Sequence, residues 1–204
     1  MSDALPMEVL KAETSGLHRA TERTALALAM GAGTMTRAEY KLQLLAYRRI
    51  LGALESALER SARPCVRAVW REDLRKVPLL ARDLETLASV IVTESAEMSS
   101  AVEARCAEIE SADGSGLLGA LYVFEGSTLG AQILRPRLAE SLALPAESLR
   151  FYEGYGRDTA RHWRAFGDRM NVALAPPDRL ASAVLAARAT FVGLGAVFDG
   201  IRSA

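Results

Sequence analysis

Residues 36–60 read TRAEYKLQLLAYRRILGALESALER, and this stretch decides the fold class. Thr36 and Glu39 have the spacing of a capping box at the start of a helix. Apolar side chains then recur every three or four residues, as on one helix face, at Tyr40, Leu44, Tyr47, Leu51, Leu54 and Leu58. The sequence therefore predicts a long amphipathic helix that ends before Pro64.

The same spacing continues through most of the chain, whereas β-branched clusters flanked by hairpin turns are missing. The apolar segment 117–144 contains Gly126, Gly130 and Pro136, so we expect a bent or broken helix there, preceded by a loop at 113–116. Further helices are expected over 6–30, 78–91 and 96–109, around 163–170, and from a cap at Asp178 to Phe198. No repeat or linker divides the chain, so we predict an all-α helical bundle, one domain over residues 1–204.

Composition narrows the function classes. The chain of 204 residues has 25 basic and 25 acidic side chains, and a formal net charge of +0 does not favour nucleic acid or an anionic membrane. Residues 1–11 lack an apolar run, so we expect neither a signal peptide nor a transmembrane segment. Cys65 and Cys106 are the only cysteines, which suits a reducing, cytoplasmic location without a disulfide framework.

Imidazole chemistry must use His18 or His162, because the chain has no other histidine. Glu22 lies one helical turn after His18, so its carboxylate could hold one ring nitrogen and leave the other free to bind a metal. The spacing alone fits equally an exposed histidine with an incidental acid nearby.

If His18 binds a metal, we expect that metal to be the iron of a haem group. One histidine holds a bare zinc or iron ion poorly, and the chain has neither a second histidine at ligand spacing nor a Cys-x-x-Cys motif. A single axial imidazole is enough for haem, because the porphyrin supplies the other four nitrogens.

Gly126 and Gly130 lie one helical turn apart and would leave one face of their helix without side chains. Such a face admits either a flat ligand or a closely packed second helix. The spacing leaves both interpretations open.

Lys11 precedes His18 by two turns, and Arg157, Arg161 and Arg164 surround His162 at helical spacing. These side chains could hold carboxylates, although an arginine stripe is also what a solvated helix face looks like. Phe191 would be a core residue unless a pocket makes it the wall of a cofactor site.

Three segments resemble the haem oxygenase family. LKAETSGLHRATE at 10–22 resembles the family's proximal helix, in which the histidine is the axial haem ligand. LYVFEGSTLGAQIL at 121–134 is similar to its glycine-rich distal helix, and residues 169–191 are similar to its last two helices. The sequence EGSTLG at 125–130 most resembles the corresponding segment of the bacterial enzymes that supply biliverdin to bacteriophytochromes.

The resemblance implies a haem oxygenase fold and roles for individual residues. His18 would ligate the iron, Glu22 would orient it, Lys11 would meet a haem propionate and Phe191 would border the haem pocket. Gly126 and Gly130 would flank the site where O2 reacts. Haem would be both substrate and prosthetic group, and O2 with electrons from a ferredoxin or flavin reductase would convert it to biliverdin, CO and ferrous iron.

The chain departs from the family pattern at two places. Ser127 stands where many members have an aspartate that orders a proton-donating water, and a hydroxyl is a poorer charge partner. Trp163 and Gly167 stand where the family has basic propionate partners, so Arg161 or Arg164 would have to replace them. Two alternatives follow: a non-catalytic haem carrier or sensor on this scaffold, and a helical bundle that binds another ligand or a partner helix.

Overall fold

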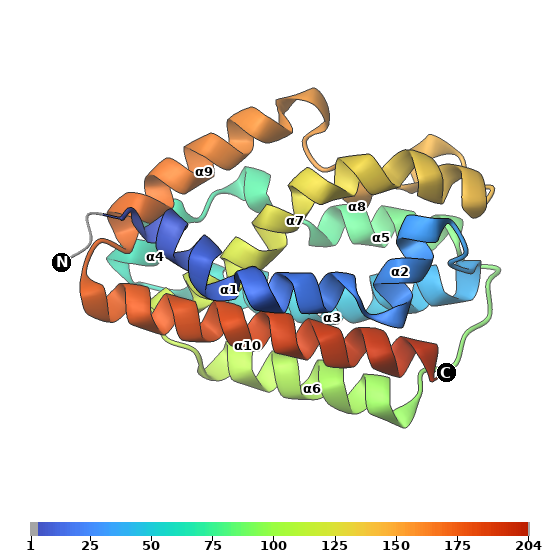
Figure 1. The fold of residues 1–204 in the computed structure, drawn as a ribbon, viewed down its shortest axis with the longest axis horizontal. Coiled ribbons are helices and arrows are strands. Elements are labelled where there is room, and N and C mark those ends of the chain that lie inside the picture. Colours follow the sequence, from blue (N-terminus) through green and yellow to red (C-terminus); the bar gives the residue numbers. More distant parts are fainter. Residues whose placement is uncertain (1–3, 204) are drawn as a thin grey trace.

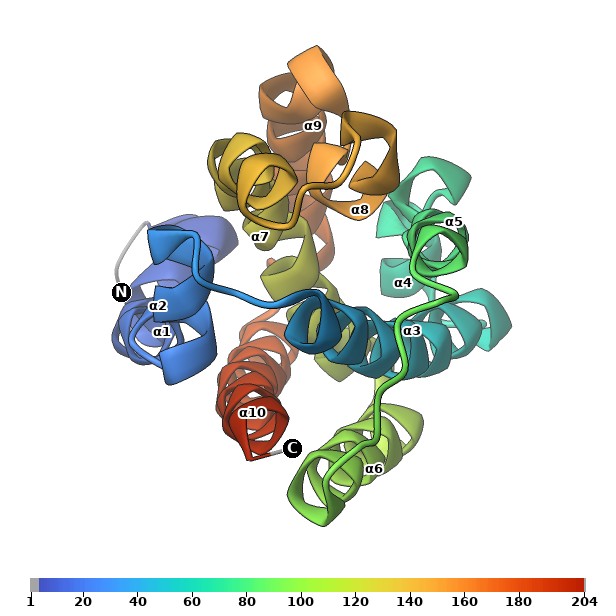
Figure 2. The same ribbon diagram turned by 90° about the vertical axis from the view of Figure 1, so that its right-hand side faces the viewer.

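The computed structural model describes residues 4–203, which fold into one all-α domain without a β-strand among them (Figure 1). Its α-helices are α1 Pro6–Glu22, α2 Ala25–Ala32, α3 Arg37–Arg60, α4 Pro64–Val69, α5 Val77–Thr86, α6 Ala96–Ser111, α7 Gly114–Ser141, α8 Arg150–Glu153, α9 Thr159–Ala173 and α10 Pro177–Arg202. Short 3-10 helices lie at η1 Glu72–Leu74, η2 Ala146–Ser148 and η3 Gly156–Asp158. Seen end on, α7 passes through the middle of the bundle and the other long helices surround it (Figure 2).

The helix predicted over 36–63 is confirmed as α3. Its capping box is formed: the Glu39 amide donates to Thr36 Oγ1 at 3.1 Å, and the Thr36 amide donates to Glu39 Oε2 at 2.7 Å. The predicted stripe packs into the core, with Tyr40 and Leu44 fully buried. The sequence pattern was sufficient here because cap and stripe indicate the same helix.

The prediction of one helix over 6–30 is wrong, because α1 ends at Glu22 and α2 begins at Ala25. Thr24 makes the break: its hydroxyl accepts from the Ala27 amide and so caps a new helix. α2 ends with its C-cap at Gly33, which has φ 70°, a left-handed conformation that costs glycine little.

The loop predicted at 113–116 is also wrong. Asp113 is the N-cap of α7, and its Oδ1 accepts from the Gly116 amide at 2.6 Å, so the glycines belong to the first helical turn. The helix itself is continuous through Pro136 and changes direction along its length, as the prediction of a bend requires (Figure 1).

Two other boundaries differ from expectation. The helix after Pro78 ends at Thr86, and Ile91 is 94% exposed instead of joining its apolar face. Asp178 does not cap the last helix: Pro176 takes that position, and Asp178 lies in the first turn of α10. There its carboxylate faces the positive end of the helix dipole.

Two helices, Gly114–Ser141 and Pro177–Arg202, are long and apolar enough to cross a membrane by length and composition. The expectation that no segment meets those criteria therefore fails for these two. The apolar window of α7 is 56% buried in the bundle, whereas that of α10 is 33% buried, although α10 contacts α7, α6 and α1. Packing therefore accounts for the apolar character of α7 more fully than for that of α10.

We expect opposite effects from alanine at two glycines of α7. A methyl group at Gly119 would collide with the backbone carbonyl of Ala183, so Gly119→Ala should lower the free energy of unfolding by about 1–3 kcal/mol or more. Gly130 has nothing within 4 Å of an added methyl group, so Gly130→Ala should raise it by about 0.5–1 kcal/mol. Urea unfolding of the haem-free protein measures both, and equal effects would contradict this account of α7.

Asp83 makes stability depend on pH. Its fully buried carboxylate accepts from the amides of Arg150 and Phe151 at 2.9 Å each, yet burial raises its pKa to about 6. The native state holds the proton at a pH where the unfolded chain has lost it, so this contribution is complete below about pH 4 and is lost as the pH rises through 6.

The excess stability of the wild type over Asp83→Asn should therefore shrink by about 2–3 kcal/mol between about pH 4 and pH 7. Urea unfolding at a series of pH values measures this difference. A difference that stays constant across the series would refute the raised pKa.

Candidate functional site

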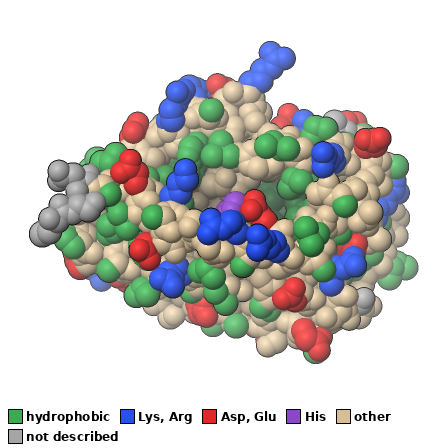
Figure 3. Space-filling model, viewed as in Figure 1, with side chains coloured by type: hydrophobic (Ala, Val, Ile, Leu, Met, Phe, Trp, Pro, Cys, Tyr) green, Lys and Arg blue, Asp and Glu red, His purple; other side chains and the backbone are tan. Residues whose placement is uncertain are grey.

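The face of the molecule between α1 and α7 is hollowed. Figure 3 shows a histidine and an acidic side chain at the edge of this hollow, with Lys and Arg side chains beside them. α1 buries only Pro6, Leu10 and Thr14, so most of its surface is accessible. His18 lies on this helix with its side chain 55% exposed, within reach of a ligand that enters the hollow.

The His18 ring is held on two sides. Its Nδ1 lies 3.5 Å from Oε2 of Glu22, one helical turn onward. The other ring nitrogen, Nε2, takes no part in this contact. The ring of Phe191, on α10, meets the imidazole edge-on with centroids 5.6 Å apart and an interplanar angle of 79°. Predicted site residues from two distant segments thus come together around one imidazole.

α7 offers a surface without side chains, as a flat ligand requires. Gly130 is exposed and an added Cβ there would have nothing within 4 Å, while one at Gly126 would meet only the Trp163 indole at 3.5 Å. Neither glycine faces another helix backbone, and Gly119 instead makes the close contact with α10. Between the two interpretations of this glycine pair, the structure therefore supports open space over close helix packing.

Beyond Gly126 the helix also exposes large apolar side chains. Leu129 is 41% exposed and Ile133 is 75% exposed, one helical turn apart. Such neighbouring apolar surface on a hollowed face is typical of a ligand-binding site.

Ser127 is exposed, and its hydroxyl donates to the Phe124 carbonyl at 2.7 Å. With that proton in use, the Ser127 oxygen can still accept a hydrogen bond from a water molecule but cannot donate one in this conformation. It therefore differs chemically from the aspartate expected at this position.

The basic residues predicted to hold propionates lie on two helices, α1 and α9. Lys11 is exposed on α1, whereas Arg161 and Arg164 are exposed on α9, and Arg161 Nε lies 3.2 Å from Asp158 Oδ1. Gly167 is buried, and a Cβ added there would be in ordinary van der Waals contact with the Met7 side chain. Their role toward a propionate remains a prediction.

A haem fits these residues better than a bare ion does. Among residues 4–203, no three His, Cys, Asp or Glu side chains come together as a metal site. One imidazole with an accessible ring, an apolar wall and a helix face without side chains match the needs of a porphyrin.

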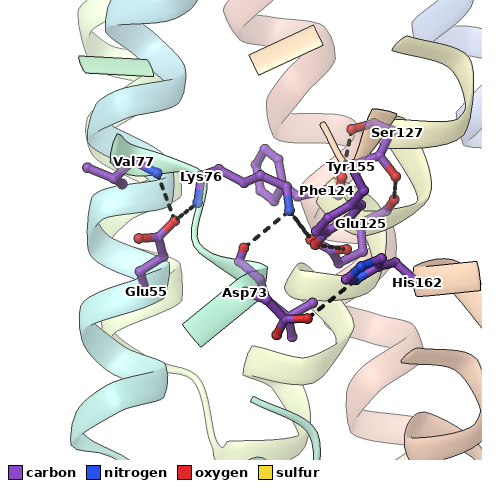
Figure 4. Close-up of polar contacts among 11 residues, drawn as sticks. Glu55, Asp73, Lys76, Val77, Phe124, Glu125, Ser127, Tyr155 and His162 are labelled. Carbon is purple, nitrogen blue, oxygen red and sulfur yellow. Dashed lines mark hydrogen bonds and ion pairs between the residues drawn. The ribbon is translucent and has the colours of Figure 1, made fainter. Parts of the chain in front are cut away.

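Sequence reasoning missed a buried polar network around Glu125, the residue before Gly126 in α7. Lys76 Nζ lies 2.5 Å from Glu125 Oε1, and Tyr155 hydrogen-bonds to both side chains. His162 stacks on Tyr155 at 4.1 Å and pairs with Asp73 at 3.3 Å (Figure 4). A signal was present in the sequence: Glu125 is a lone acid in an apolar run, and a buried acid needs a partner.

Comparison with known proteins agrees with this geometry. A family model described as Heme oxygenase matches residues 6–199. The heme oxygenase of Leptospira interrogans shares 21% identity with a TM-score of 0.80, covering 96% of this chain and 99% of that one. No curated protein sequence matches.

Two further structures show how far the fold extends. Heme oxygenase-2 from Synechocystis, in complex with heme and NO, shares 20% identity with a TM-score of 0.88, covering 98% of this chain and 86% of that one. A domain of unknown function from Shewanella denitrificans, described as having a heme oxygenase-like fold, shares 12% identity with a TM-score of 0.72, covering 99% and 94%. The all-α fold is therefore the haem oxygenase fold, and with a family match over nearly its whole length the chain belongs to the haem oxygenase family.

Proposed function

We propose that this protein is a haem oxygenase that opens haem to biliverdin, CO and ferrous iron, using O2 and external electrons. The observation that carries the proposal is the His18 imidazole, with Nδ1 toward Glu22 and its edge on Phe191, on a hollowed face between α1 and α7, the helix that holds Gly126 and the open position Gly130. Bound haem would supply the iron that binds O2.

The chain's own residues would divide the remaining tasks. His18 Nε2 would bind the iron, and Glu22 would accept a hydrogen bond from the Nδ1–H group and so hold the ring in its orientation. Gly130 would leave room for O2 near the ring edge, and Ser127 would hold a water by accepting its hydrogen bond. Lys11, Arg161 and Arg164 are the candidates for holding propionates.

Partners and location belong to the same proposal. A ferredoxin or flavin reductase would deliver the electrons, because the sequence has no nucleotide-binding fingerprint of its own. The sequence motif EGSTLG at 125–130 supports a bacteriophytochrome as the acceptor of biliverdin. We place the reaction in the cytoplasm, without a nucleic acid or membrane partner.

A second candidate is a haem-binding protein that does not open the ring. The Ser127 hydroxyl favours it, because its proton goes to Phe124 instead of to a water that could donate in turn. Members of one fold can differ in activity while keeping the ligand site.

Hemin titration tests binding at His18. The wild type should show a saturable Soret shift at one hemin per chain, and His18→Ala should weaken binding by tenfold or more and change the spectrum, because the axial ligand is lost. Glu22→Gln should weaken it by about tenfold through the ring orientation. Glu13→Gln is the matched control, an exposed acid on the same helix that pairs with Arg188 instead. If Glu13→Gln and Glu22→Gln behave alike, Glu22 has no orienting role.

Turnover separates the two candidates. In air, with ascorbate or a ferredoxin system, the wild-type hemin complex should lose its Soret band and yield a green, extractable bilin. Ser127→Asp should speed this reaction by about tenfold or more, because a carboxylate holds a proton-donating water better than an engaged hydroxyl does. A Soret band that survives reductant and air, with no bilin extracted, would leave only the haem-binding candidate.

A further inference from the structure

The buried ion pair between Lys76 and Glu125 lies beside the predicted haem-facing segment of α7. Both side chains are almost fully buried, with 3% and 2% exposed, and Lys76 Nζ lies 2.5 Å from Glu125 Oε1. Burying two charges costs free energy that only complete hydrogen bonding offsets. We therefore expect this buried ion pair to have a specific structural role.

The network satisfies its polar groups. Lys76 Nζ donates to Glu125 Oε1, to Tyr155 Oη at 2.8 Å and to the Leu74 carbonyl at 3.2 Å, which uses all three ammonium protons (Figure 4). The Tyr155 hydroxyl donates to Glu125 Oε2 at 2.9 Å. Burial and the nearby Glu125 carboxylate raise the pKa of Tyr155, so the phenol keeps the proton it donates.

Lys76 is itself fixed to the core. Glu55, on α3, accepts from the Lys76 amide at 2.6 Å and from the Val77 amide at 3.0 Å through the same oxygen, Oε1. Glu125 is thereby tied to α3, to the start of α5 and to the turn before η3. Its position does not depend on α7 alone.

Glu125 marks the point where α7 changes character. Every residue from Gly114 to Glu125 is buried, whereas Gly126 is half-buried and Ser127 is exposed. The hydroxyls of Ser127 and Thr128 donate to the carbonyls of Phe124 and Glu125 at 2.7 and 2.6 Å. Such bonds back to the preceding turn bend helices, and glycine in the same turn lowers the resistance to bending.

We propose that Glu125, held by Lys76 and Tyr155, is a positioning residue that anchors the last buried turn of α7 and so sets where the 126–133 segment lies over the haem. This inference rests on the proposed function for the identity of the ligand. The anchor itself is a property of the haem-free chain, so the two can fail separately.

The test uses the full chain without haem. The triple variant Lys76→Met, Glu125→Leu, Tyr155→Phe replaces the three polar ends by apolar groups of similar size and leaves none of the three charged or unpaired, which keeps the fold. Its matched control is Lys41→Met, which removes another lysine anchor, from Lys41 Nζ to the carbonyls of Leu87 and Val90. Hydrogen–deuterium exchange is measured over 126–133, with 114–121 of the same helix as reference.

We expect exchange over 126–133 to rise by about tenfold in the triple variant, with 114–121 and the control unchanged. Unchanged exchange over 126–133 overturns the proposal. If the triple variant does not fold, Tyr155→Phe alone decides: it removes one of the two bonds to Glu125 and should raise exchange in the same segment by about threefold. If Tyr155→Phe shows the same exchange rate over 126–133 as the wild type, the proposed anchoring role of Glu125 is likewise overturned.

A second readout concerns the ligand. In the reduced hemin complex with added CO, the C–O stretching band should broaden or shift in the triple variant and not in Lys41→Met, because a mobile segment presents several environments to the bound gas. An unaltered band in a variant with raised exchange shows that the anchor does not reach the ligand and overturns the positioning role. If the wild type binds no hemin, the proposed function fails. The exchange measurement on the haem-free chain still tests whether Glu125 anchors the 126–133 segment.

Discussion

The backbone of α7 touches the backbone of α10 at Gly119 and Ala183, and the candidate site depends on this contact. A side chain at Gly119 would hold the two helices apart, and α10 carries Phe191 two turns beyond Ala183. Because Phe191 meets the His18 ring, the same helix that fixes α7 also fixes the imidazole. Core packing and ligand geometry are therefore set by one pair of helices.

α7 combines two kinds of helix in one continuous element. Its first part is a core helix with no exposed residue up to Glu125, and its second part has Leu129, Gly130 and Ile133 exposed. A helix buried all round stays in place through packing alone, whereas a half-exposed one needs other constraints. The buried pair of Lys76 and Glu125 lies at the junction, where packing ends and the open wall begins.

Membership of the haem oxygenase family does not by itself establish the reaction. The three solved structures compared above share 21%, 20% and 12% identity with this chain, and one of them is a domain of unknown function. What distinguishes an enzyme from a carrier on one scaffold is the chemistry of a few atoms. In the function that we propose, these atoms are the Nε2 of His18 and the hydroxyl of Ser127, beside the space left by Gly130.

The sequence by itself determined the all-α class, the α3 helix and the candidate residues, because capping and periodicity are local and because Glu22 follows His18 by one helical turn. It placed Asp113 in a loop, since a polar residue beside glycine suits a cap as well as a turn. It joined α1 to α2 because the apolar stripe continues past Thr24 at helical spacing. Only the tertiary structure decided that Gly119 packs helices while Gly130 faces open space, and that Lys76 reaches Glu125. The physical reason is that these distinctions depend on contacts between residues far apart in the chain, which no local pattern encodes.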